Sequence, residues 1–232
     1  MSSKKVKVKV KKKKLKIKRL LITLLLLIAI FFLMTYLIKI PTKNIYIKGN
    51  NILSDKEIIE IAKLTNYPPY LKTYFLNIKK NLLKNDYIKN VKITRKIFNK
   101  IYIEIEEYKP ICIYEDKLIL SSQKKVTNKY GIEYVPYIIN DIDEIYKKAI
   151  NKFSLINDEI LIKISQIEYV PNEVDKERFI LYMTDSNYVY INLPNIEKIN
   201  KYNSIVKQLD GKKGIIYLDL GDYIEIKGWH NL

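Results

Sequence analysis

The chain of 232 residues is short of the residue types that build many catalytic and metal-binding sites. Its one cysteine, Cys112, excludes an internal disulfide framework and a zinc site made of several thiolates. Its one histidine, His230, lies close to the C-terminal end, where chains commonly fray, so most histidine-based catalysis has no residue to use. Six glycines could hardly build a phosphate-binding loop, and no such motif occurs. We therefore expect no catalytic residues, no bound metal and no cofactor.

Acidic residues are missing from the first 54 positions, and basic residues are crowded into the same stretch. Eleven of the 42 lysines and arginines fall within residues 1–19. Residues 20–232 hold 31 basic against 25 acidic side chains, so only +6 of the total net charge of +17 belongs to them. The basic excess is thus confined to a tail, which argues against a nucleic-acid-binding domain. A hydrophobic content of 48% argues against a disordered chain.

Charge is absent from the nineteen residues Leu20–Ile38. As an α-helix this segment would be about 28 Å long, close to the thickness of the hydrocarbon core of a bilayer. A cleavable signal peptide usually has a shorter apolar region that ends at a small-residue cleavage site, and Thr35–Lys39 offers no such site. The sequence therefore predicts an uncleaved transmembrane helix over residues 20–38.

The charges on the two sides of this helix predict its orientation. Eleven basic residues precede it, whereas only Lys39, Lys43 and Lys48 follow it closely. The positive-inside rule places residues 1–19 in the cytoplasm and residues 39–232 outside, as a single-pass type II membrane protein. The basic tail could also be read as a nucleic-acid-binding patch, but its position against the membrane favours topology and attraction to anionic lipid.

Residues 42–108 combine strand and helix patterns. Alternating apolar and polar residues predict strands over 45–48, 91–94 and 101–106, with turns at 49–51 and 97–100. Two helices are expected between the first and second strands, one begun by a capping box at Ser54 and Glu57 and one over Asn77–Lys84. A small sheet covered on one face by two helices follows. The residues expected to face inward are Ile58, Ile61, Ala62 and Thr65 in the first helix and Ile78, Leu82 and Leu83 in the second.

An ordered set of residues connects these elements. It reads Ile45-x-Ile47-x-Gly49-Asn50, then Val91-x-Ile93-x-Arg95, then Asn99 in the turn, then Glu106-Glu107-Tyr108-Lys109-Pro110 after the last strand. Placed just after a basic tail and one apolar helix, this set resembles the POTRA domain of the bacterial cell-division proteins FtsQ and DivIB. Ile97 and Phe98 depart from the Trp-Pro of the family's turn, and Arg95 and Glu106 could instead form a cross-strand pair. The positions that carry the resemblance are Gly49, Asn50, Arg95, Asn99, Glu106 and Pro110.

Residues 111–232 read mainly as strands and predict a mixed, mainly antiparallel β domain with helices. A strand pair is expected within 111–120, helices after Asp141 and Ser154, and a further helix over Asn195–Leu209. In the strand over 214–220, alternation places one set of side chains in the core and the other in solvent. The inward set is Ile216, Leu218 and Leu220, and the outward set is Ile215, Tyr217 and Asp219.

The C-terminal end of the chain resembles the end of the FtsQ β domain, where a Tyr-x-Asp strand is followed by a last strand and Gly-Trp. The resemblance implies that this end holds two small bitopic proteins, one like FtsB or DivIC and one like FtsL. Strand addition at the edge of a sheet would supply main-chain hydrogen bonds for such a contact. The residues expected to make it are Tyr217, Asp219, Tyr223, Glu225 and Trp229.

Other functional readings find less support. Ser121-x-x-Lys124 matches the motif of penicillin-interacting serine enzymes, but it follows a strand and lacks the partner motifs. Glu104 and Glu106 could suggest an acid/base pair, but they share the polar face of a strand, where we expect them to be exposed to solvent. A POTRA chaperone of an outer-membrane transporter would need a barrel that the sequence does not show.

The sequence therefore predicts an α+β, non-catalytic scaffold at the division septum that links early division proteins to cell-wall synthesis. We expect no nucleic acid and no small-molecule substrate. The alternative is a membrane-anchored enzyme, or a regulator, of envelope synthesis.

Overall fold

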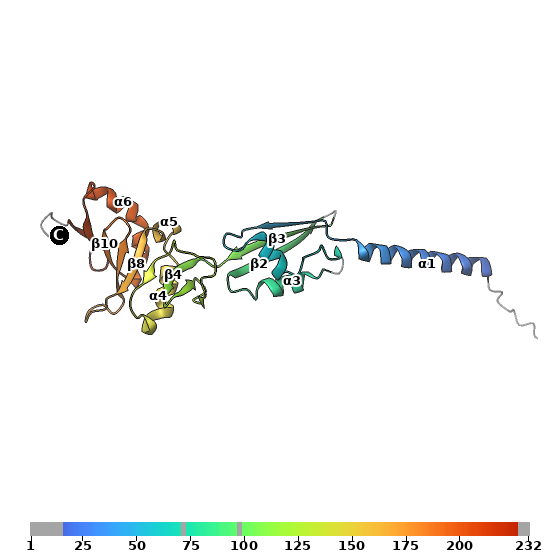
Figure 1. The fold of residues 1–232 in the computed structure, drawn as a ribbon, viewed down its shortest axis with the longest axis horizontal. Coiled ribbons are helices and arrows are strands. Elements are labelled where there is room, and N and C mark those ends of the chain that lie inside the picture. The colour runs from blue at the N-terminus through green and yellow to red at the C-terminus, as the bar shows by residue number, and fades with distance from the viewer. Residues whose placement is uncertain (1–15, 71–72, 97–98, 227–232) are drawn as a thin grey trace, which may run out of the picture.

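The computed structural model of the chain describes residues 16–70, 73–96 and 99–226. Figure 1 shows three parts in a row: the apolar helix α1, a three-stranded sheet and a nine-stranded sheet. The prediction of an α+β fold with an N-terminal apolar helix is confirmed. Trp229 and His230, and the tail up to residue 15, lie outside the described residues.

The helix α1 spans Ile17–Lys39, so it begins three residues before and ends one residue after the predicted segment. None of its 23 residues is buried, and its mean hydropathy reaches 2.8. At 1.5 Å per residue it is about 34 Å long. Within the described ranges it is the one helix long and apolar enough to cross a membrane.

The three-stranded sheet follows α1 after four residues. Its strand order is β1-β3-β2, with β1 parallel and β2 antiparallel to the central β3. The predicted order of strand, helix, helix, strand and strand is confirmed. The elements are β1 (Asn44–Lys48), α2 (Asp55–Ile61), α3 (Phe75–Leu82), β2 (Ile88–Lys96) and β3 (Lys100–Glu107).

The two helices of this part end earlier than the sequence predicts. The capping box of α2 is present: the Ser54 hydroxyl accepts from the Glu57 N–H, and the Glu57 carboxylate accepts from the Ser54 N–H, which lowers the pKa of Glu57. The helix stops before Lys63, whose φ of 57° is left-handed, so Leu64 enters the core and the predicted Thr65 is exposed. In the same way Leu82 ends α3 and is buried, whereas the predicted Leu83 is 42% exposed.

The carboxylate of Glu107, at the end of β3, holds the loop that follows β1. It accepts hydrogen bonds from the backbone N–H groups of Asn51, Ile52 and Leu53 at 2.8, 2.7 and 2.9 Å. Three successive N–H groups directed at one carboxylate form a strong, charge-assisted contact. The neighbouring Glu106 points to the other side and pairs with Lys89 at 2.6 Å, both side chains being about half exposed. Glu107 therefore ties the first strand to the last.

Replacing Glu107 is expected to destabilise this part of the chain. Glu107→Ala removes the acceptor of three backbone donors and should lower the free energy of unfolding by about 2 kcal/mol, because hydrogen bonds to charged groups contribute more than neutral ones. Urea denaturation of the full chain in detergent, followed by far-UV circular dichroism, measures this change. Glu106→Ala is the matched control and should shift the midpoint little, since surface ion pairs contribute little. Equal midpoints for the two variants would contradict the role given to Glu107.

The nine-stranded sheet has the order β12-β11-β10-β9-β8-β7-β4-β5-β6. Five of its neighbouring pairs are antiparallel, and the pairs β10–β11, β4–β7 and β7–β8 are parallel, which agrees with the predicted mixed sheet. Its strands are β4 (Pro110–Tyr114), β5 (Lys117–Leu120), β6 (Lys125–Val126), β7 (Tyr137–Ile138), β8 (Ile164–Tyr169), β9 (Arg178–Met183), β10 (Tyr188–Asn192), β11 (Gly214–Tyr217) and β12 (Tyr223–Ile226).

Several helical segments of this part differ from the prediction. The helix expected from Ser154 is a single turn, since Ser154 ends the preceding helix and Ile164 already belongs to β8. The helix expected over Asn195–Leu209 is largely a 3₁₀ helix with a short α-helical turn, and Asp210 and Gly211 end it with positive φ. The segments are η2 (Asp143–Ile145), α4 (Tyr146–Phe153), α5 (Asp158–Leu161), η3 (Leu193–Lys201), α6 (Tyr202–Val206) and η4 (Lys207–Leu209).

The two sheets are joined by side chains as well as by the chain itself. Tyr130 donates to the Glu57 carboxylate at 3.1 Å, and Lys124 pairs with Asp86 at 2.7 Å. Cys112 is fully buried in a core that continues from one sheet to the other, and burial raises the pKa of its thiol. Cys112 therefore packs as a small core residue and is not a reactive thiol.

Candidate partner-binding surface at the C-terminal end of the sheet

The strand β12 is one edge of the nine-stranded sheet, and β11 lies between it and β10. The Leu218 N–H donates to the Tyr190 carbonyl at 2.8 Å, so the even-numbered residues of β11 direct their main-chain groups to β10. The odd-numbered residues of β11 then bond to β12, opposite Tyr223 and Glu225. Ile224 and Ile226 are left with their N–H and C=O groups directed away from the sheet. The free edge therefore has an outward row of donors and acceptors.

One face of this end of the sheet is covered and the other is open. Phe179, Val189 and Ile216 lie on the covered face and are buried, and the ring of Phe179 packs against Phe153 of α4 with ring centroids 5.2 Å apart. The side chains that alternate with the buried ones point to the opposite face. Those of β9, β10 and β11 on that face are only partly buried. In β12 they are exposed, with Tyr223 at 49%.

A row of aromatic rings crosses this open face. Tyr190 on β10 stacks on Tyr217 on β11, with ring centroids 5.1 Å apart, and Tyr217 stacks on Tyr223 on β12 at 4.5 Å. The Arg178 guanidinium lies 4.2 Å from the centroid of Tyr190 and continues the row onto β9. Stacked rings of this kind form a broad apolar surface with polar tips, as in many protein interfaces. We call Arg178, Tyr190, Tyr217 and Tyr223 the tyrosine row.

Carboxylates lie beside these rings. The Tyr217 hydroxyl donates to Glu225 at 3.2 Å, and its partial burial, with the nearby Glu225 charge, raises the pKa of Tyr217. Tyr182, in the adjacent row of the same face, donates to the Glu168 carboxylate, and this hydrogen bond, together with burial, raises the pKa of Tyr182 to about 12. The raised pKa values keep Tyr182 and Tyr217 neutral, as hydrogen-bond donors, at physiological pH.

The positions of Asp219 and Leu220 correct the predicted alternation. Asp219 is not outward: its side chain is fully buried and pairs with Arg178 at 2.6 Å. Leu220 is not in the core: it is 70% exposed. The regular strand ends at Tyr217, so the alternation expected over 214–220 stops three residues early. Asp219 thus supports the tyrosine row from within and cannot itself touch a partner.

A family model for the POTRA domain of the FtsQ type matches residues 40–108. The cell division protein DivIB of Bacillus subtilis is 28% identical over 169 residues, which cover 68% of this chain and 62% of that protein. The cell division protein FtsQ of Rickettsia felis is 25% identical over 104 residues, which cover 44% of this chain and 39% of that protein. Residues 40–108 are a POTRA domain of the FtsQ type, and the chain is similar to the cell division proteins FtsQ and DivIB.

The match to these relatives is partial. The chain spans about three fifths of the length of the DivIB proteins it matches. Among solved structures, the major extracytoplasmic domain of the trans isomer of DivIB from Geobacillus stearothermophilus has 17% identity and a TM-score of 0.37, over 45% of this chain and 96% of that chain.

The residues that carry the resemblance of residues 42–108 to the FtsQ/DivIB family have structural roles. Gly49 has a φ of 85°, and a Cβ atom there would lie 2.1 Å from the Ile105 carbonyl oxygen, so only glycine fits. Asn50 donates to the Leu53 carbonyl and to Asp55. Asn99 has a φ of 57° in the β2–β3 turn, whose residues 97–98 lie outside the described ones.

The proposed pairing of Arg95 with Glu106 is wrong. Arg95 lies opposite Ile101 and donates to the carbonyls of Tyr70 and Thr73, while Glu106 pairs with Lys89. Arg95 therefore fastens the loop before α3 to β2. Pro110 is buried at the start of β4.

The residues considered for catalysis are not assembled for it. Lys124, the second member of the serine-enzyme motif, pairs with Asp86, and the Ser121 hydroxyl accepts from the Lys109 N–H at 3.1 Å. No metal-binding cluster of acidic, cysteine or histidine side chains occurs among the residues that the structure describes.

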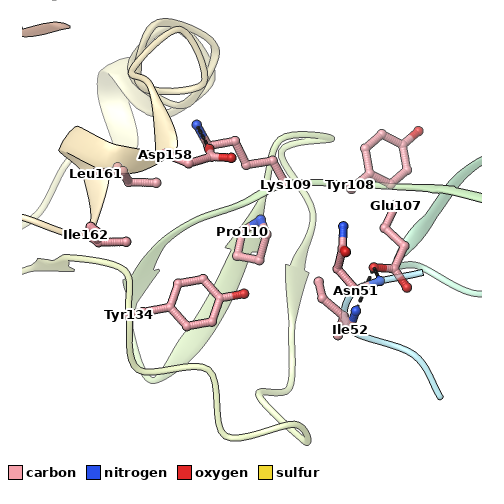
Figure 2. A pocket seen from close by; sticks show the side chains of 10 residues that line it. All are labelled: Asn51, Ile52, Glu107, Tyr108, Lys109, Pro110, Tyr134, Asp158, Leu161 and Ile162. Atoms are coloured by element: carbon pink, nitrogen blue, oxygen red, sulfur yellow. Dashed lines mark hydrogen bonds and ion pairs between the residues drawn. The ribbon is translucent and has the colours of Figure 1, made fainter. Parts of the chain in front are cut away.

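A cavity of about 400 Å³ lies where the two sheets meet, and Figure 2 shows its lining. Lys109, at its wall, pairs with Asp158 at 2.5 Å, and Glu107 is occupied by backbone donors. The charged groups of the cavity are thus used within the fold.

Sequence reasoning missed five residues of the candidate surface: Arg178, Tyr182, Tyr190, Ile224 and Ile226. Tyr182, Tyr188 and Tyr190 do stand at even spacings on two consecutive strands, which is a readable signal for one shared face. No local sequence pattern indicates that Arg178 belongs to this surface, because its partner Asp219 is 41 positions away.

Proposed function

We propose that the chain is a non-catalytic, single-span scaffold of the division machinery. It would hold two bitopic proteins, one like FtsB or DivIC and one like FtsL, and so link early division proteins to septal cell-wall synthesis. The observation that carries this proposal is the free edge of β12, where Ile224 and Ile226 direct main-chain groups outward beside the tyrosine row. An added strand gains affinity from main-chain bonds and specificity from side chains on each face.

The proposed orientation follows from the charges around α1. Residues 1–19 would lie in the cytoplasm near anionic lipid, and both sheets would lie outside, at the septum. Two partners anchored in the same membrane have a high effective concentration for this edge, so modest intrinsic affinity is enough. Similarity to the matched relatives supports a role in division, because they are named cell division proteins.

The surface proposed for the partners consists of Tyr217, Tyr223 and Glu225, with Ile224 and Ile226 supplying main-chain bonds. Tyr190 and Arg178 hold the inner end of the row in place. Trp229, which the sequence also proposes, lies outside the described residues, three positions after Ile226.

Removal of the edge strand tests the proposal. A chain that ends at Gly221 lacks β12 but keeps Ile216, Leu218 and the buried Asp219, which a cut at residue 214 would remove. Co-purification of the two tagged bitopic proteins from membranes should fall to background, while the truncated chain still inserts into the membrane through α1.

The matched control removes two stacked tyrosine rings from the three-stranded sheet. Tyr46 and Tyr102 stack at 4.6 Å on the three-stranded sheet, and Tyr46→Ala/Tyr102→Ala should leave co-purification unchanged. Full co-purification with the chain that ends at Gly221 would rule out the edge of β12 as the binding site.

A further inference from the structure

The end of the three-stranded sheet nearest α1 is tied to the membrane helix. Four residues, Ile40–Lys43, separate α1 from β1. Within them the Thr42 N–H donates to the Pro68 carbonyl at 3.1 Å, the Lys43 N–H donates to the Asn99 carbonyl at 3.0 Å, and the Ile40 carbonyl accepts from the Tyr70 N–H at 2.9 Å. Residues 68–70 and Asn99 therefore lie beside the short segment that joins α1 to β1. With α1 as a membrane anchor, this end of the sheet would face the membrane surface.

Positive charge gathers at this end without compensating acid. Residues 61–85 and 87–103 contain no aspartate or glutamate. Within the part of the chain that the structure describes, none of the basic residues at this end forms an ion pair with a carboxylate. These basic residues are Lys39, Lys43, Arg95, Lys96 and Lys100.

The same strand provides a contrast at its other end. Lys89 and Lys92, farther from α1 on β2, pair with Glu106 at 2.6 Å and Glu104 at 3.3 Å. Lys96, at the end of β2 near the membrane, lies opposite Lys100 in the β2–β3 register, so two like charges face each other. Like charges directly opposite each other in a sheet are unfavourable, and an anion bound beside them would relieve the repulsion.

Aromatic rings accompany these charges. Tyr46 stacks on Tyr102, and the Lys96 ammonium lies 4.7 Å from the centroid of Tyr102. An open hollow of about 420 Å³ is lined by Arg95, Lys96, Lys100 and Tyr102 alone, that is, by basic groups and one tyrosine. Tyrosine with lysine or arginine is the combination found at the interface between membrane and water.

We propose that this end of the domain binds the phosphate groups of anionic phospholipids in the leaflet beside it. The charge complementarity is with phosphate, and the tether of four residues makes the headgroups of the membrane that α1 crosses the nearest source of it. Such binding would limit rotation of the two sheets about Ile40–Lys43. The proposal does not depend on the orientation of α1 or on the partners of β12, since the domain adjoins the membrane on either side.

The experiment measures how close β2 lies to the headgroups. Thr94, exposed on the open face of β2, is changed to cysteine in the full chain and labelled with a fluorophore, while the buried Cys112 stays unlabelled. The chain is placed in nanodiscs that contain headgroup spin-labelled lipid. Quenching should be about twofold greater in discs with phosphatidylglycerol than in discs of phosphatidylcholine alone, and the difference should shrink in high salt.

Two matched double variants separate this site from general basicity and from the basic tail. Lys96→Gln/Lys100→Gln should reduce quenching in phosphatidylglycerol discs to the level in phosphatidylcholine discs. Lys89→Gln/Lys92→Gln removes the same charge from the same strand and should leave quenching unchanged. Equal quenching in the two kinds of disc, measured on the labelled chain with all of these lysines present, would overturn the proposal. Loss of the quenching difference when soluble poly(glycerol phosphate) is added at constant ionic strength would also overturn the proposal. The site would then bind free phosphate polymer in preference to lipid headgroups.

Discussion

Proline at Ile224 is expected to abolish capture of the two bitopic partners without unfolding the chain. The Ile224 N–H points away from β11, so proline there removes a donor that the fold itself does not use. An incoming strand would lose one main-chain hydrogen bond and would meet the ring of the proline, which together should weaken binding by at least about tenfold. Co-purification of the tagged partners with the full chain, and thermal unfolding of the same preparation, measure both halves of the prediction.

The matched controls follow from the alternation of main-chain directions. Ile224→Val keeps the N–H and the β-branched shape, so binding should persist. Tyr223→Pro removes an N–H that the fold does use, since it donates to the Gly221 carbonyl at 3.1 Å in the turn before β12, and should lower the unfolding temperature. If Ile224→Pro and Ile224→Val retained partners equally, strand addition at β12 would be excluded.

Much of the fold follows from local patterns in the sequence. The capping box at Ser54 and Glu57 and the alternation in β3 each depend on residues close in the chain, and the structure has both. The strand pair expected within 111–120 is another such case: β4 and β5 pair across a tight hairpin in which Glu115 and Asp116 have φ values of 50° and 56°.

The parts that the sequence did not predict depend on residues far apart. Asp219 reads as an outward residue until Arg178, on another strand, is known to pair with it. Leu83 and Thr65 fit the helical period, but each falls beyond the helix end that its neighbours impose. Leu193–Lys201 has helical spacing of its apolar residues, and periodicity alone does not distinguish a 3₁₀ from an α-helical winding.

The site was predictable only in outline for the same reason. An edge strand near the C-terminus follows from chain order, and β12 is at the edge. The stacking of Tyr190 on Tyr217 requires the parallel pairing of β10 with β11, which brings together positions 27 residues apart and which no local pattern announces.

Removing Arg178 is expected to be the most damaging single change at the C-terminal end. The Asp219 side chain is fully buried, and its Oδ1 atom has no hydrogen-bond partner among the described residues, so Arg178 is its main compensation. Arg178→Ala should lower the free energy of unfolding by about 3–5 kcal/mol, because it leaves a buried charge unpaired. Urea denaturation of the full chain in detergent measures this loss.

The double variant decides whether that loss comes from the unpaired charge or from the missing packing on Tyr190. Arg178→Ala/Asp219→Ala removes both charges, so it should be more stable than Arg178→Ala alone, since no carboxylate is then left buried without a cation. The ring of Tyr190 would still lack its guanidinium neighbour, 4.2 Å away, so recovery should be incomplete. A double variant as unstable as Arg178→Ala would place the whole effect in packing and would contradict the electrostatic role of the pair. Because Arg178 lies at the inner end of the tyrosine row, partial recovery of stability should be accompanied by partial recovery of partner binding.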